Sequence, residues 1–204
     1  YANESILRDR KRLLALKIQT TRGGSPSGID QSWLATMLEL YGLKHLDYEE
    51  LLARVDIIPP SLAIAQAAEE SGWGTSRFAT EGNALFGQRI YRQHKSGMIP
   101  FERAAGKTFK VRAFDQLIDG VKAYVHNLNS HFAYNEFRTQ RAVLRKAEGH
   151  IDGYSLAGAL TRYSERGEEY IDSIRLIMRA NALQFFDSAQ LGKSHFTELV
   201  GPDA

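Results

Sequence analysis

The stretch IIPPSLAIAQAAEESGWGTSRFATEGNALFGQ, residues 57–88, decides the fold. Its first half predicts a short apolar helix over residues 61–71, because prolines suit a helix entry and a glycine suits its exit. The entry prolines are Pro59 and Pro60, and the exit glycine is Gly72. Alanines and one isoleucine surround this segment with small apolar groups, which predicts a helix buried on most sides.

Two carboxylates, Glu69 and Glu70, stand at the carboxyl end of this predicted helix. The helix dipole disfavours anions there by a few tenths to about 1 kcal/mol, so stability alone would not select them. Apolar surroundings and the dipole both raise the pKa of such a carboxyl, which suits a general acid. The alternative is a pair of solvated residues at a frayed helix end. The run Ser71-Gly72-Trp73-Gly74 favours the acid, because glycines admit a ligand to the backbone and tryptophan offers sugars a flat face.

The run AAEESGWGTSRFATEGNALFGQ resembles the signature of the glycoside hydrolase family 73 glucosaminidases, and the resemblance extends over roughly residues 56–183. In that family the glutamate directly before Ser-Gly is the catalytic acid, a role that the resemblance assigns to Glu70. The family's Asn-Leu-Phe-Gly element reads here Asn83-Ala84-Leu85-Phe86-Gly87, with alanine where asparagine is usual. Asn83, one position earlier, is the candidate for that role. The resemblance also implies peptidoglycan glycan strands as the partner.

The composition fits one globular domain with appendages and excludes several classes of site. The 204 residues carry a net charge of +2, too weak to indicate a nucleic-acid partner. The basic run 8–12 has acids nearby and is interpreted as a solvated helix face. Cysteine and the HExxH pattern are absent, and no metal or organic cofactor is expected. No stretch approaches the ~20 apolar residues of a membrane helix.

The chain starts at Tyr1 without methionine, so we expect an export signal to have been removed. We therefore expect a periplasmic or cell-envelope location, and a monomer.

Helical patterns precede and follow a short segment of strand-like alternation. Asp30, Asp47 and Asp115 are the predicted helix N-caps. Helices are predicted over residues 4–19, 30–40, 48–55, 61–71, 116–128, 137–147, 155–163 and 168–186, and strands over 88–90, 96–101 and 108–114. This order predicts an α+β, lysozyme-like fold, mainly α-helical, with a small antiparallel β lobe flanking a cleft. The expected divisions are an N-terminal helical brace (1–55), the glucosaminidase domain (56–187) and a C-terminal tail (188–204).

Glycoside hydrolysis usually needs a second carboxylate, which this architecture would supply from the β lobe. Glu102 is the only acid between residues 88 and 114 and is the candidate, with a solvated turn residue as the alternative. Glu81 and Asp115 are weaker candidates. The resemblance also places a tyrosine at the cleft, which here is Tyr163. The alternative is a core aromatic residue with a solvated hydroxyl.

Further candidates for substrate binding come from the aromatic residues near the signature. Trp73, Phe86 and Tyr91 could stack on sugars, although aromatic residues lie in the core more often. Gln88, which closes the signature, is grouped with them.

The favoured function is an endo-β-N-acetylglucosaminidase that cleaves peptidoglycan, with Glu70 as the general acid. A lytic transglycosylase would use the same fold and a single glutamate. A third possibility is a wall-binding module that keeps the cleft but has little activity.

Overall fold

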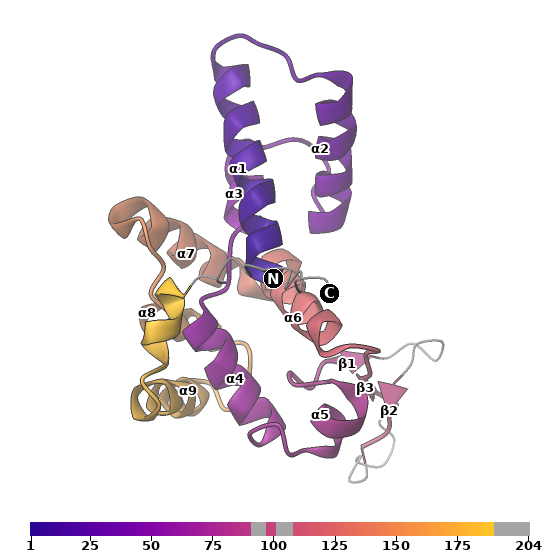
Figure 1. Cartoon of the computed structure of the whole chain (residues 1–204), viewed down its shortest axis with the longest axis vertical. Coiled ribbons are helices and arrows are strands. Elements are labelled where there is room, and N and C mark those ends of the chain that lie inside the picture. Colours follow the sequence, from indigo (N-terminus) through magenta and orange to yellow (C-terminus); the bar gives the residue numbers. More distant parts are fainter. Residues whose placement is uncertain (91–96, 101–107, 190–204) are drawn as a thin grey trace, which may run out of the picture.

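The computed structural model describes residues 1–90, 97–100 and 108–189. It confirms the predicted α+β, lysozyme-like class: helices form most of the molecule, and a small antiparallel sheet lies at one side (Figure 1). The elements are α1 (Ala2–Thr21), α2 (Gly28–Tyr41), α3 (Tyr48–Arg54), α4 (Pro60–Ser71), α5 (Arg77–Gly82), β1 (Arg89–Ile90), β2 (Gly97–Met98), β3 (Lys110–Arg112), α6 (Leu117–Ser130), η1 (Phe132–Tyr134), α7 (Asn135–Glu148), α8 (Gly153–Ala157), η2 (Gly158–Leu160), α9 (Glu168–Ala180) and η3 (Leu183–Ser188).

Helix α4 has the bounds that the sequence indicated. It runs from Pro60 to Ser71, and its C-cap is Gly72, whose φ of 57° lies in the left-handed region. Leu62 and Ala65 are completely buried, because α4 packs against α8, α9 and η3. Ile64 is 39% exposed, so one strip of the helix stays open.

A carboxylate from the far end of the chain binds the amino end of α4. Asp187 of η3 accepts hydrogen bonds from the backbone N–H of Ser61 (2.8 Å) and from its hydroxyl (2.7 Å). It also accepts one from the N–H of Gly153 at 3.2 Å. The first N–H groups of a helix have no partner within the helix, and the dipole favours a negative charge there. Asp187 therefore ties α8, η3 and α4 together.

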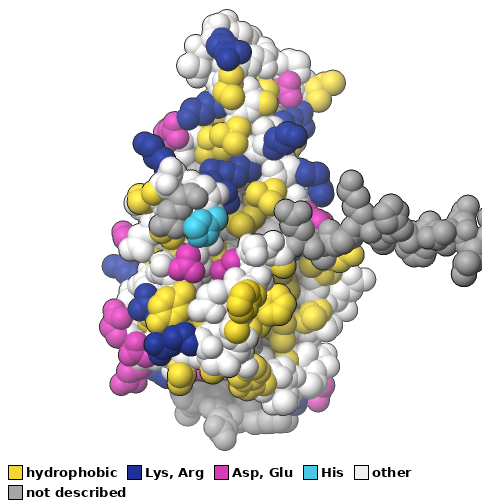
Figure 2. Space-filling view, turned by 60° about the vertical axis from the view of Figure 1, so that its left-hand side comes forward, with side chains coloured by type: hydrophobic (Ala, Val, Ile, Leu, Met, Phe, Trp, Pro, Cys, Tyr) yellow, Lys and Arg dark blue, Asp and Glu magenta, His cyan; other side chains and the backbone are white. Residues whose placement is uncertain are grey.

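The first three helices pack onto α6 and α7. Helix α1 lies against α3 and α6, and α2 lies against the same two helices. Asn3 exchanges two hydrogen bonds with the backbone of Ile58, at 2.8 and 3.3 Å. Arg12 forms an ion pair with Asp30 at 2.7 Å, which gives one arginine of the basic run 8–12 an acidic partner. Figure 2 shows basic and acidic side chains interspersed over the visible face, which is typical of a solvated surface.

The sheet has the strand order β1-β3-β2 and is antiparallel throughout. Val111 of the middle strand is opposite Arg89 on one side and Met98 on the other, and it is 6% exposed. Gly120 lets α6 approach the turn after α5, since a Cβ there would come within 2.6 Å of the Asn83 carbonyl oxygen. The sheet is thereby held beside α6.

One predicted helix cap is confirmed and two are wrong. Asp47 accepts hydrogen bonds from the first turn of α3, as predicted. Helix α2 begins earlier than expected, because Ser27 is the cap: its hydroxyl accepts a hydrogen bond from Asp30 N–H and donates one to the Asp30 carboxylate. Helix α6 follows Gln116 with no side-chain cap, so the prediction for Asp115 was wrong.

The long helix predicted over residues 168–186 is two elements. Helix α9 ends at Ala180, and η3 follows after Ala182, whose φ of 51° breaks the helical path. Of the predicted tail, residues 190–204 lie outside the described residues. Within the described ranges, no helix has the length and apolar character to cross a membrane.

Candidate active site

A pocket of about 530 Å³ opens at the carboxyl end of α4. Its walls come from the end of α4, the segment leading into β1, α6, η1 and the segment that precedes α9. The lining residues are Glu70, Phe86, Gly87, Gln88, Arg89, Asn127, Tyr134, Tyr163, Ser164, Glu165 and Arg166. Several of these side chains are polar, which suits a sugar ligand better than an apolar one.

The carboxyl group of Glu70 lies in this pocket with a raised pKa. Glu70 is open to the pocket, but the protein atoms around its carboxyl exclude enough water to raise the pKa. The negative charge of Glu69 raises it further, while a hydrogen bond from Tyr170 and the charges of Arg166 and Arg89 lower it. The net shift is upward, the direction that a general acid requires.

A chain of buried hydrogen bonds leads to Glu70. The Tyr124 hydroxyl donates to Gln66 Oε1 at 2.6 Å, and Gln66 Nε2 donates to the Tyr170 hydroxyl at 2.9 Å. Because the Tyr170 oxygen accepts from Gln66, its own proton is directed to the Glu70 carboxylate. Gln66, Tyr124 and Tyr170 are each at most 1% exposed, so the chain holds the carboxyl in one orientation.

Two further tyrosines surround the same carboxyl. Tyr163 stacks on Tyr170 with ring centroids 5.5 Å apart, and Tyr134 lies 6.0 Å from Tyr163. Burial, first of all, raises the pKa values of Tyr163 and Tyr134, and the charge of Glu70 adds to both shifts. These hydroxyls therefore keep their protons and can act as hydrogen-bond donors and acceptors near Glu70.

The neighbouring carboxylate, Glu69, has a different environment. It forms an ion pair with Arg166 at 2.6 Å, and Arg166 also donates to the Ser173 hydroxyl at 2.7 Å. Glu69 thus forms a surface ion pair, while the side chain of Glu70 lies in the pocket.

The structure brings some of the predicted binding residues to this pocket and leaves others outside. Tyr163 and Gln88 line it, as does Phe86. However, Phe86 is only 6% exposed, and its ring is stacked on Tyr124 with centroids 3.8 Å apart. One face of the Phe86 ring is therefore already covered by protein.

Trp73 and Asn83 do not line the pocket around Glu70. Trp73 is 63% exposed and has a φ of 59°, so its indole projects from the turn after α4. Asn83 ends α5 in the left-handed conformation, and its amide donates to the carbonyl oxygens of Phe114 (3.0 Å) and Asp115 (3.3 Å). These contacts give Asn83 a structural role.

The second carboxylate stays a prediction. Glu102 and Tyr91 lie outside the described residues. Glu81 forms a surface ion pair with Arg77 at 3.7 Å, and Asp115 lines a separate hollow. In the described part of the chain, Glu165 is the other acid that lines the Glu70 pocket, and no group of three potential metal ligands is found.

The sequence reasoning did not find the residues that support Glu70. These are Gln66, Tyr124, Tyr134, Asn127, Tyr170 and Arg166. Gln66 did carry a signal, since a polar residue four positions before Glu70 shares its helix face in an otherwise apolar stretch. The tyrosines come from other helices, and their proximity depends on the tertiary packing.

We predict that Tyr170→Phe raises the pKa of Glu70, because the variant removes a hydrogen bond that lowers it. A general acid is lost as pH rises through its pKa, so the alkaline limb of the pH–rate profile should move to higher pH. The measurement is kcat/KM against pH, with Tyr154→Phe as the control, since Tyr154 lies on α8 outside the pocket. A loss of rate at every pH without movement of this limb would mean that Tyr170 only supports the fold.

These features define a class of protein: a helical α+β domain with a protonatable glutamate in an open, polar pocket. The chain belongs to the glucosaminidase family, since the family model described as mannosyl-glycoprotein endo-beta-N-acetylglucosaminidase matches residues 46–183. The resemblance inferred from the signature is therefore confirmed.

A curated relative is the protein named bax of Escherichia coli (strain K12), which is 34% identical over 174 residues. The match covers 82% of this chain and 60% of that protein, so the chain spans about 60% of the length of this relative. The search found no matching solved structure.

Proposed function

We propose that this protein is an endo-β-N-acetylglucosaminidase that hydrolyses the glycan strands of peptidoglycan. The observation that carries the proposal is the carboxyl group of Glu70, which combines a raised pKa with an open polar pocket in a chain of the glucosaminidase family. In this mechanism Glu70 donates its proton to the leaving glycosidic oxygen.

The surroundings of Glu70 would assist this step. Tyr170 orients the carboxyl through the buried chain that starts at Tyr124. Tyr163 and Asn127 lie in the wall of the pocket, where a hydroxyl and an amide can bind sugar hydroxyls. Glu102 remains our prediction for the group that activates water or attacks the sugar. Peptidoglycan as the substrate places the protein in the cell envelope or periplasm.

A lytic transglycosylase is the second candidate. It needs only one glutamate, and in the described part of the pocket Glu70 is the carboxyl with a raised pKa. In that reaction a hydroxyl of the substrate attacks, and the product has an anhydro end. A wall-binding module with little activity is a third candidate, which the presence of the protonatable Glu70 disfavours.

Mass spectrometry of the digested glycan separates these functions. We expect each cut to add one water and to leave N-acetylglucosamine at the new reducing end. Products that lack the added water and carry an anhydro sugar would identify a transglycosylase instead. If the glycan binds but no fragments form, the protein is a binding module.

A further inference from the structure

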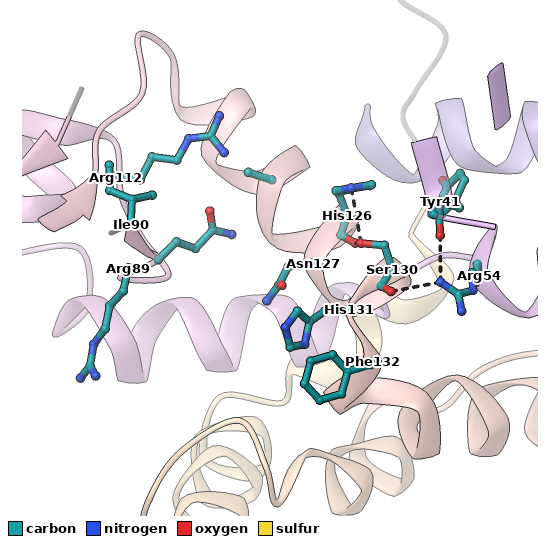
Figure 3. A pocket seen from close by; sticks show the side chains of 13 residues that line it. Tyr41, Arg54, Arg89, Ile90, Arg112, His126, Asn127, Ser130, His131 and Phe132 are labelled. Atoms are coloured by element: carbon teal, nitrogen blue, oxygen red, sulfur yellow. Dashed lines mark hydrogen bonds between the residues drawn. The ribbon is translucent and has the colours of Figure 1, made fainter. Parts of the chain in front are cut away.

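A second pocket, of about 710 Å³, continues from the pocket of Glu70. The two share the wall residues Gln88, Arg89 and Asn127, so they lie next to each other. In Figure 3, Arg89, Ile90 and Arg112 come from the strands on one side, and His126, Asn127, Ser130 and His131 come from α6 and the residue after it. Tyr41 and Arg54 close the end away from the strands.

The lining of this second pocket is positively charged. It includes Arg54, Arg89 and Arg112, and it includes no Asp or Glu among the described residues. The guanidinium of Arg54 already has hydrogen-bond partners within the protein, since it donates to Glu50 and to two backbone carbonyls. Burial lowers the pKa of His126, which disfavours a positive charge on this histidine.

Arg89 and Arg112 differ from Arg54 because neither forms an ion pair with a described residue. Each guanidinium lies over an aromatic ring, Arg89 at 4.6 Å from the centroid of Phe109 and Arg112 at 4.7 Å from that of Phe114. Such stacking fixes the plane of a guanidinium and leaves its edge N–H groups free to donate. Arg112 also lines a neighbouring hollow together with Asp115 and Asp119, but no ion pair between them and Arg112 is found in the described part of the chain.

We propose that this pocket binds the carboxylates of the peptide stems carried by the glycan strand. The inference rests on the proposed function and deepens it. N-acetylglucosamine rings are neutral and are bound by hydroxyls, amides and ring faces. Carboxylates on a substrate, in contrast, are the groups that a planar guanidinium binds in a bidentate manner. In peptidoglycan the stem peptides carry such carboxylates, and the second pocket opens directly beside the site of cleavage.

Arg112 is the better residue for a test. Arg89 lines both pockets, and its charge lowers the pKa of Glu70, so its removal would also change the acid. Arg112 lines the second pocket but not the pocket of Glu70. Arg112→Ala removes its charge, and Arg112→Lys keeps it.

The test uses two soluble stem-bearing glycan substrates that differ only in charge. In both, the stem amines are acetylated, and in one the carboxylates are then converted to amides. We expect the wild type to cleave the amidated glycan with about a tenfold lower kcat/KM, the size of one charge-assisted hydrogen bond. Arg112→Ala should lose about tenfold on the carboxylate substrate and nothing on the amide. Arg112→Lys keeps the charge but not the bidentate geometry, so it should keep only part of the preference.

Arg8→Ala is the matched control, since Arg8 is exposed on α1 outside both pockets. Wild-type cleavage of the two substrates at equal rates would overturn the stem inference and leave the proposed function intact. An equal loss on both substrates in Arg112→Ala would also overturn it.

Binding to an inactive chain gives a readout that does not need cleavage. The Glu70→Gln variant and the Glu70→Gln/Arg112→Ala double variant are each titrated with both glycans. When Arg112 is removed, we expect weaker binding of the carboxylate glycan and unchanged binding of the amidated glycan. If the wild type cleaves neither glycan while this difference in binding is found, the proposed function fails and the stem site stands. Equal binding of both glycans to both variants would overturn the stem site.

Discussion

Glu70→Gln is expected to lower the rate of peptidoglycan cleavage by about 10²–10⁴, the usual loss when a general acid is removed. Glutamine keeps the size of the side chain and an oxygen that accepts the hydrogen bond from Tyr170, but it has no proton to donate to the glycosidic oxygen. The measurement is the release of reducing ends from purified peptidoglycan.

The same variant should fold at least as stably as the wild type. The pKa of Glu70 is higher in the folded state than in the unfolded state. At pH values between the unfolded and the folded pKa, the folded state therefore binds more protons. The contribution of this group to folding stability therefore falls as pH rises from the unfolded pKa through the folded pKa. Glutamine does not titrate, so above the unfolded pKa the variant does not carry this penalty, and the Tm should be unchanged or higher.

Glu69→Gln is the matched control, because Glu69 is adjacent in sequence and lies in a surface ion pair with Arg166. Its loss removes a negative charge that raises the pKa of Glu70. Arg166, whose positive charge lowers that pKa, then has no Glu69 to pair with. We expect activity to be retained at low pH and the alkaline limb to move to lower pH. Wild-type turnover in Glu70→Gln, or equal inactivation by both variants, would contradict the assignment of Glu70.

Asp56→Ala is expected to destabilise the fold by about 3–5 kcal/mol, the usual effect of removing one partner from a buried ion pair. Asp56 is 2% exposed, and its carboxylate accepts two hydrogen bonds from Arg145, both at 2.6 Å. Arg10 of α1 approaches the same carboxylate at 3.3 Å. The completely buried Arg141 donates to the backbone oxygen of Asp56 at 3.1 Å.

The size of the effect follows from what the variant leaves behind. Burial lowers the pKa of Arg141 to about 10, so its guanidinium is still charged at neutral pH. Without Asp56, the buried or half-buried cations of Arg10, Arg141 and Arg145 would repel one another with no counterion between them. The Asp56 carboxylate thereby links Arg10 of α1 to Arg145 of α7.

Thermal and urea unfolding measure this prediction. For a chain of this length, 3–5 kcal/mol corresponds to a decrease in Tm of about 6–20 °C. Glu81→Ala is the control: Glu81 lies in an exposed i,i+4 pair with Arg77, and such pairs contribute about 0.3–0.5 kcal/mol. A similar decrease in both variants would show that Asp56 is no more important than a surface acid.

Local signals in the sequence predicted those elements whose boundaries are encoded locally. Gly72 and Asp47 act where predicted, because a left-handed C-cap and an aspartate N-cap each involve only neighbouring residues. Asp30 was misassigned although Ser27 lies three positions before it, a local Ser-x-x-Asp pattern that favours the serine as the cap. The end of α9 at Ala180 could not be predicted from periodicity, because the apolar residues of η3 continue the pattern.

The sequence pointed to four residues that line the pocket, Glu70, Phe86, Gln88 and Tyr163, but not to the residues that support Glu70. Glu70 could be proposed because its helix position and the glycines after it lie in one stretch. Tyr170, in contrast, binds a residue 104 positions away, and that contact depends on the packing of α4 against α9. Asn83 was proposed as a site residue because it lies one position before the place where the family's Asn-Leu-Phe-Gly element has its asparagine. In the structure it ends α5 in the left-handed conformation, which asparagine adopts more easily than most residues.

The contact between Asp187 and Ser61 also has a consequence for the order of events during synthesis. The two residues are 126 positions apart, so the ribosome needs on the order of ten seconds to add the second after the first. Until then, the helix that carries Glu70 lacks the carboxylate at its amino end and the packing of η3. A nascent chain that ends before Asp187 should therefore have an incompletely ordered site. If the proposed function is right, the ability to cut the wall is acquired late, when the domain is almost complete.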